Sequence, residues 1–140
     1  MNLSAKTEYA CLAMLELAKE YDSGEPLQLR RIAAEHGIPA RFLVQILLQL
    51  KGAGLVASTR GAAGGYRLAR PPQEITLADV IDVIDGDDRP TSNAAKSSPL
   101  VRALLSFCCE VSELQRDRLD AESLADLVTV ATQREPMYFI

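Results

Sequence analysis

The sequence predicts a mostly α-helical fold with a small β-hairpin, and three patterns between residues 29 and 70 support this prediction. A helical pattern of apolar residues runs up to Gly37, and a second helical pattern follows it. Alternating apolar and polar residues then flank a glycine-rich loop. Two short helices followed by a glycine-tipped hairpin, the wing, are the plan of a winged helix-turn-helix.

Three helices are predicted in the first part of the chain. The first covers residues 5–19 and the second covers about 28–36. Gly37 ends the second helix, because glycine adopts a left-handed conformation without steric cost. Pro39 stands where a third helix, over about 39–51, begins. The side chains of the third helix that we expect to point inward are Phe42, Leu43, Ile46, Leu47 and Leu50.

The wing is predicted from two strands, around 55–59 and 66–69, which the small residues 61–65 join. Thr76 is the predicted N-cap of a short helix that follows. The apolar face of that helix consists of Leu77, Val80, Ile81 and Ile84. We therefore expect a winged helix-turn-helix domain over residues 1–84.

Residues 85–98 form a predicted linker, and residues 99–140 are expected to hold a long dimerisation helix and a C-terminal helix. Asp120 is the predicted N-cap of the C-terminal helix, and the apolar residues 137–140 have no assignment. Two adjacent rows of apolar residues follow the long helix, and so wide a face exceeds what one small domain covers. The expected dimer contacts are Leu100, Leu104, Phe107, Cys108, Val111 and Leu114.

The charge distribution favours a polyanionic partner, although the net charge is −4 at pH 7. Residues 28–70 contain seven basic side chains and one acidic side chain, a local charge of +6. Residues 73–140 contain six basic and thirteen acidic side chains, a local charge of −7. The local field steers a polyanion more than the total charge does. Together with the winged helix-turn-helix pattern, the basic part predicts DNA binding.

Arg41, Gln45 and Gln49, spaced by four residues, form a polar stripe on the third predicted helix. Arginine can pair two donors with guanine, glutamine can match adenine, and Val44 can touch a thymine methyl group. Arg60 at the wing tip can enter a minor groove. The other candidate DNA contacts, most of them suited to phosphate, are Lys6, Arg30, Arg31, Lys51, Arg67 and Arg70. The alternative for each residue is a solvated basic face.

No pattern in the sequence predicts an enzyme, a cofactor or a metal site. His36 is the only histidine, and we expect a structural or phosphate-contact role at a helix C-terminus. The acidic cluster of Asp79, Asp82, Asp85, Asp87 and Asp88 lacks the glycine and terminal glutamate of a calcium loop, so we expect a solvated face. No apolar run approaches the length of a membrane span and the start resembles no secretory signal, which favours the cytoplasm.

The three cysteines, Cys11, Cys108 and Cys109, have no spacing typical of a disulfide framework or a zinc ribbon. Cys108 and Cys109 are neighbours on a predicted helix and point about 100° apart, which disfavours a shared metal or a mutual disulfide. Buried thiols are the default interpretation. Redox sensing by Cys108 or Cys109 stays open, because reactivity needs an exposed, electropositive setting.

The chain resembles the Rrf-two family of bacterial transcription regulators over nearly its whole length. The segments that carry this resemblance are Leu3-Ser-Ala-Lys-Thr-Glu-Tyr-Ala10, Ile32-Ala-Ala-Glu-His-Gly-Ile38, Leu50-Lys-Gly-Ala-Gly-Leu-Val56, Arg60-Gly-Ala-Ala-Gly-Gly-Tyr66 and Leu68-Ala-Arg-Pro-Pro-Gln-Glu-Ile-Thr-Leu77. The resemblance implies a homodimer joined through the long helix, with each third helix presented to one half of a palindromic DNA site. By the same resemblance, Arg41, Phe42 and Gln45 match the family's recognition helix, and Arg60 with Gly61 matches the wing tip.

The chain departs from the family pattern in two places. Val44 stands where some members have a glutamate that helps to select among operators, so the target sequence does not transfer. Members that hold an iron–sulfur cluster have three cysteines around the entry to the dimer helix, but residues 85–100 contain none. Ser98-Pro-Leu100 resembles the last Cys-Pro-Leu of those members, and serine is a poor iron ligand beside thiolate.

The function that the sequence predicts is a homodimeric, sequence-specific DNA-binding transcription regulator that is expected to repress and that senses without an iron–sulfur cluster. Its expected partners are double-stranded DNA with a palindromic operator, a second copy of the chain, and a small-molecule or protein effector. One alternative is a winged-helix interaction module that docks a metabolic enzyme. The other is a thiol-based redox-sensing regulator.

Overall fold

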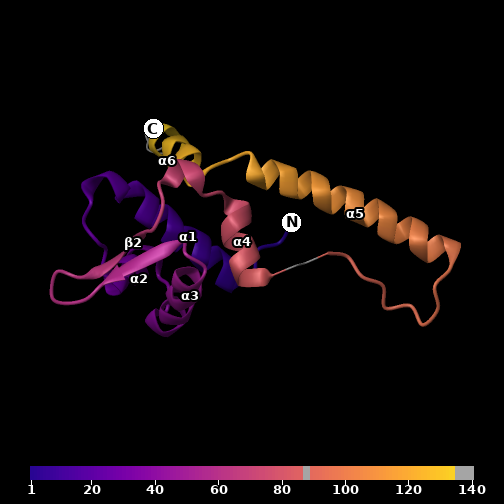
Figure 1. Ribbon diagram of the computed structural model, residues 1–140, viewed down its shortest axis with the longest axis horizontal. Coiled ribbons are helices and arrows are strands. Elements are labelled where there is room, and N and C mark those ends of the chain that lie inside the picture. Colours follow the sequence, from indigo (N-terminus) through magenta and orange to yellow (C-terminus); the bar gives the residue numbers. More distant parts are fainter. Residues whose placement is uncertain (87–88, 135–140) are drawn as a thin grey trace.

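The computed structural model describes residues 1–86 and 89–134, so Asp87, Asp88 and the apolar end 137–140 lie outside the described residues. Figure 1 shows a group of helices with a small hairpin at one side, whose loop projects outward, and one long helix that projects away from the rest. The elements in order are α1 (Ala5–Lys19), the 3-10 helix η1 (Tyr21–Ser23), α2 (Leu29–His36), α3 (Ala40–Gly52), β1 (Val56–Thr59), β2 (Gly65–Leu68), the 3-10 helix η2 (Pro72–Glu74), α4 (Leu77–Asp85), α5 (Pro99–Asp120) and α6 (Leu124–Arg134).

The core forms around α1, with α3, α4, α6 and the hairpin packed on it. The predicted inward residues Leu43, Ile46, Leu47 and Leu50 of α3 are confirmed, since each is at most 1% exposed. Phe42 was predicted to point inward, and this prediction is wrong, because 47% of its surface is exposed. With about 100° between successive residues, Phe42 falls at the margin of the buried stripe.

The start of α4 follows the prediction. The Thr76 hydroxyl accepts a hydrogen bond from the Asp79 amide (3.2 Å), and the Asp79 carboxylate accepts one from the Thr76 amide (3.0 Å). This reciprocal pair is a capping box, which satisfies two backbone donors at the helix start. It fixes the point at which the chain leaves the wing and enters α4.

The prediction that Asp120 caps the last helix is wrong. Helix α5 continues through Asp120, and Ser123 caps α6 instead, with its hydroxyl 3.1 Å from the Asp126 amide. The Leu124 amide donates to the Ile75 carbonyl (2.8 Å), and the Leu124 side chain is fully buried. The last helix therefore packs in the same core as α1, while the division of the chain at residues 85–98 stays a prediction.

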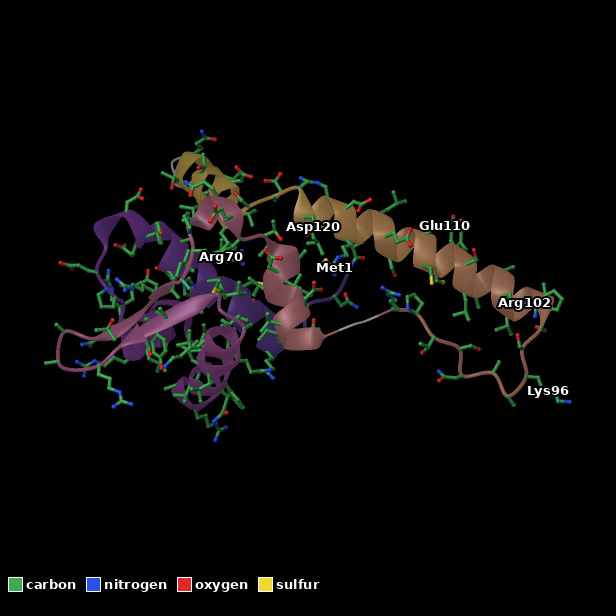
Figure 2. The ribbon with its side chains drawn as sticks, viewed as in Figure 1. Met1, Arg70, Lys96, Arg102, Glu110 and Asp120 are labelled. Atoms are coloured by element: carbon green, nitrogen blue, oxygen red, sulfur yellow. The ribbon has the colours of Figure 1, made fainter. Side chains whose placement is uncertain are left out.

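Helix α5 is tethered to the rest of the molecule near its C-terminal end. There the Arg116 guanidinium forms a two-pronged ion pair with the Asp82 carboxylate of α4. Figure 2 shows Asp120, Glu110 and Arg102 following one another along α5 toward its far end. No residue of this helix is buried within the single chain.

Candidate nucleic-acid interface

The turn between α2 and α3 sets the angle at which α3 faces outward. Gly37 ends α2 in the left-handed conformation (φ 64°), and the Ile38 amide donates to the Ala33 carbonyl (2.9 Å). His36 at the end of α2 lies with its Nε2 atom 3.0 Å from Glu16 Oε1 on α1. Of the two roles expected for His36, the structure therefore supports the structural one.

The outer face of α3 carries the predicted reading residues. Arg41, Gln45 and Gln49 are exposed, and Val44 beside them is 37% exposed. These side chains lie on the part of the helix opposite Leu43, Ile46, Leu47 and Leu50, which are buried. The predicted stripe is thus a free surface held on a helix whose other side is fixed in the core.

Sequence reasoning missed one residue of this face. Leu48 is 51% exposed, and it follows Arg41 and Gln45 at the helical spacing of four and three. The sequence could have indicated that Leu48 is exposed, because the four core positions of α3 already define which side of the helix faces outward. Phe42 lies at the edge of the same surface, where the Arg41 guanidinium carbon stands 4.9 Å from the centre of its ring.

The wing is a two-stranded antiparallel hairpin, with Val56 opposite Leu68 and Thr59 opposite Gly65. Strand β2 is joined to the segment before α2, because Leu27 and Tyr66 exchange two backbone hydrogen bonds (2.8 and 2.7 Å). This pairing places the wing and the helix-turn-helix in a fixed mutual arrangement. Arg60 and Gly61 are exposed at the start of the loop between the strands.

A short chain of side chains also links α2 with the wing loop. The Gln28 side-chain Nε2 donates to the Ala62 carbonyl (3.3 Å), and the Arg30 guanidinium donates to the Gln28 side-chain oxygen (3.1 Å). This contact brings Arg30 into the neighbourhood of the wing. The remaining predicted basic contacts are all exposed, namely Lys6 on α1, Arg31 on α2, Lys51 on α3, Arg67 on β2 and Arg70 after it.

The described acidic residues of α4 are partly or fully exposed, and each also makes a contact within the fold. Asp79 completes the helix cap, Asp82 pairs with Arg116, and Asp85 accepts a hydrogen bond from the Thr7 hydroxyl (2.8 Å). Each described carboxylate of this cluster therefore has a partner within the fold.

The residues present do not fit an iron–sulfur cluster. Ser98, which by the resemblance matches a ligand cysteine of cluster-bearing members, accepts a hydrogen bond from the Val101 amide (3.2 Å) through its hydroxyl as the cap of α5. Cys11 is buried on α1, while Cys108 and Cys109 are half-buried on α5. Over residues 1–86 and 89–134, no group of three or more potential metal ligands comes together.

The apolar row of α5 lies open in the single chain. Leu100, Leu104, Phe107, Val111 and Leu114 are each between 47% and 83% exposed. Single exposed apolar residues are common on proteins, but a continuous row along one helix is typical of a surface that contacts another molecule.

Comparisons with known proteins agree with this architecture. Residues 3–130 match the sequence model of the family Rrf2, described as "Iron-dependent Transcriptional regulator". CymR, an HTH-type transcriptional regulator of Bacillus subtilis, is 33% identical over 138 residues, which cover 99% of this chain and 97% of that protein. The chain spans about half the length of two Mycobacterium tuberculosis relatives, which are 51% identical over 86 residues.

Solved structures give the same result. The structure of CymR, the global cysteine regulator of B. subtilis, has a TM-score of 0.76 and 34% identity and covers 93% of this chain and 98% of CymR. The structure of T. potens IscR has a TM-score of 0.79 and 30% identity and covers 96% and 91% of the two chains. The winged-helix fold predicted from the sequence is confirmed. The chain belongs to the Rrf2 family, and it is a DNA-binding transcriptional regulator.

Proposed function

We propose that the protein acts as a homodimeric repressor that binds a palindromic DNA site, with α3 as the reading helix and the wing as a second contact. The observation that carries this proposal is the exposure of Arg41, Val44 and Gln45 on one side of a helix whose other side is fixed by four buried residues. Arginine and glutamine supply hydrogen bonds for base edges, and Arg60 on the wing extends the basic surface.

The second half of the proposal is a dimer formed through α5. Its row of exposed apolar residues, with half-buried Cys108 beside it, matches what a helix presents to a second helix. Burial of such a row stabilises association by about 25 cal/mol for each Å² of apolar surface removed from water. The dimer sets the distance between two reading helices, which is why the DNA site is expected to be palindromic.

The signal that the regulator detects is proposed to be something other than an iron–sulfur cluster, because residues 85–100 contain no cysteine and Ser98 caps α5. Thiol oxidation stays a candidate, because neither Cys108 nor Cys109 is fully buried in the single chain. A small-molecule or protein effector also stays a prediction. An open pocket of about 540 Å³ beside β2 is lined among others by Tyr21, Leu27 and Tyr66.

The family relationship favours the regulator over an interaction module that docks a metabolic enzyme. None of the described helices is long and apolar enough to cross a membrane. We infer that the protein binds DNA in the cytoplasm and catalyses no reaction.

The proposal is tested by titrating the protein against the DNA upstream of its own gene at low salt. We expect tight binding by the native protein and at least tenfold weaker binding by the variant Arg41→Ala/Arg60→Ala, because each protomer loses two arginine side chains that contact DNA. The matched control is Arg102→Ala/Arg118→Ala, which removes the same number of exposed charges from α5. Absence of binding at low salt, or equal affinity of the first variant and the native protein, contradicts the proposal.

A further inference from the structure

The reading face of α3 contains an apolar strip in addition to its polar side chains. Val44 and Leu48 stand one helical turn apart and are 37% and 51% exposed. Neither side chain belongs to the cluster of buried residues that forms the hydrophobic core. The strip is therefore a separate surface feature of the helix.

Leu48 lies at the middle of the outward side of α3. Successive residues are about 100° apart around a helix, so a position seven residues after Arg41 returns to within about 20° of it. Viewed down the helix axis, Leu48 falls between Val44 on one side and Arg41 and Gln45 on the other. Leu48 therefore faces the same side of α3 as Arg41 and Gln45, about two turns after Arg41 and less than one turn after Gln45.

The charge around this strip indicates what covers it. The exposed neighbours on α2, α3 and the wing include Arg30, Arg31, Arg41, Lys51 and Arg60. This setting favours a polyanion over an apolar protein surface. In the major groove of DNA, the group that suits an aliphatic side chain is the C5-methyl group of thymine.

We propose that Leu48, together with Val44, reads the methyl groups of two thymines in each half of the DNA site, which makes Leu48 a specificity-determining residue. This inference rests on the proposed function of α3 as the reading helix. Four residues of helix rise about 6 Å, and base pairs are spaced by about 3.4 Å. The two thymines therefore stand one or two base pairs apart, next to the bases that Arg41 and Gln45 contact.

The inference is tested on a site selected from a random DNA pool by the full-length native protein. Each thymine of the half-site is replaced in turn by deoxyuridine, which removes only the methyl group. At two positions we expect the affinity to fall about fourfold, the effect of exposing one buried methyl group. Leu48→Ala should bind the thymine and deoxyuridine forms equally at one of these positions, and Val44→Ala should do so at the other.

Two controls keep the result interpretable. Val130→Ala removes an exposed aliphatic side chain of α6 and should keep the full response to deoxyuridine at both positions. Leu48→Gln restores a side chain of similar length with amide chemistry, and at the Leu48 position it should prefer adenine over thymine. Thermal unfolding of each variant confirms that the fold is intact.

The outcomes separate this inference from the proposed function. If the protein selects a site but no thymine responds to loss of its methyl group, or if Leu48→Ala keeps the full response, the inference is wrong and DNA binding stands. If no site is selected and the protein binds no DNA at low salt, the proposed function fails and the inference falls with it.

Discussion

The Thr7 hydroxyl joins the start of α1 to the end of α4. Thr7 is fully buried, accepts a hydrogen bond from the Ser4 hydroxyl (2.9 Å) and donates one to the Asp85 carboxylate (2.8 Å). Thr7→Val keeps the shape and removes these bonds, so we expect the free energy of unfolding to fall by about 1 kcal/mol. Thr129→Val, at an exposed hydroxyl of α6, is the matched control and should change it little. Equal effects of the two substitutions in urea unfolding would contradict this account of Thr7.

Cys11 makes the stability of the fold depend on pH. Burial, and to a smaller extent the negative charge of Asp85, raise the pKa of its thiol from 9.0 to about 11. Between these values the unfolded chain releases the proton and the folded chain keeps it, so stability is fully present below pH 9 and is lost as pH rises toward 11. Relative to Cys11→Ala, the native free energy of unfolding should fall by about 2 kcal/mol between pH 8 and pH 11. A difference that does not change with pH would show that the thiol is not held neutral.

At the scale of elements, the wing depends on two glycines at close approaches of the backbone. A Cβ atom at Gly64 would lie closer than 3.0 Å to the Thr59 backbone, and one at Gly65 would lie closer than 3.0 Å to the Leu27 carbonyl. Gly65→Ala should therefore separate the wing from α2, lower the melting temperature and weaken DNA binding. Gly52→Ala adds the same methyl group to α3 in open space and should preserve or raise the melting temperature. If the melting temperatures of both variants match that of the native protein, the wing tolerates the displacement.

Most elements could be predicted from the sequence because local patterns determine them. Apolar periodicity located α1 and α3, glycine ended α2, and Thr76 capped α4, each to within a residue or two. The start of α6 was missed because Asp120 and Ser123 are both good N-caps, and the choice between them depends on where Leu124 packs. That packing is a tertiary contact with Ile75, which no local pattern encodes.

In the candidate site, too, some residues could be predicted from local patterns while others depend on tertiary packing. Arg41, Gln45 and Arg60 could be found because their charge or amide groups have an obvious chemistry for DNA. Phe42 was predicted to point inward from its hydrophobicity and Leu48 was not assigned, because whether an apolar residue is buried depends on the width of the face that neighbouring elements cover. On α3 the covered face consists of four buried residues, Leu43, Ile46, Leu47 and Leu50. The other large apolar side chains of the helix stay exposed.

At the scale of the whole molecule, we expect α5 to form the interface between two chains. The winged helix-turn-helix part of each chain should fold around its own core without that interface. Leu104→Asp/Phe107→Asp places two charges on the exposed apolar row, and their burial in an interface would be unfavourable. We expect a monomer in analytical ultracentrifugation, with circular dichroism close to native and DNA affinity at least a hundredfold lower, since one protomer reaches only half a site. Val130→Asp on α6 is the control and should remain dimeric. A variant on α5 that stays dimeric would place the interface elsewhere.

The central claim is that the protein binds DNA as a symmetric dimer, in which the basic winged surface of each protomer contacts one half of the site. One titration of the full-length protein with its selected operator, followed by sedimentation at 50 and 200 mM salt, tests it most directly. We predict two protomers for each operator and an affinity that falls about 1,000-fold or more over this range, as expected when several phosphate contacts release counterions. A single protomer on the operator, or an affinity that salt does not change, would contradict the account.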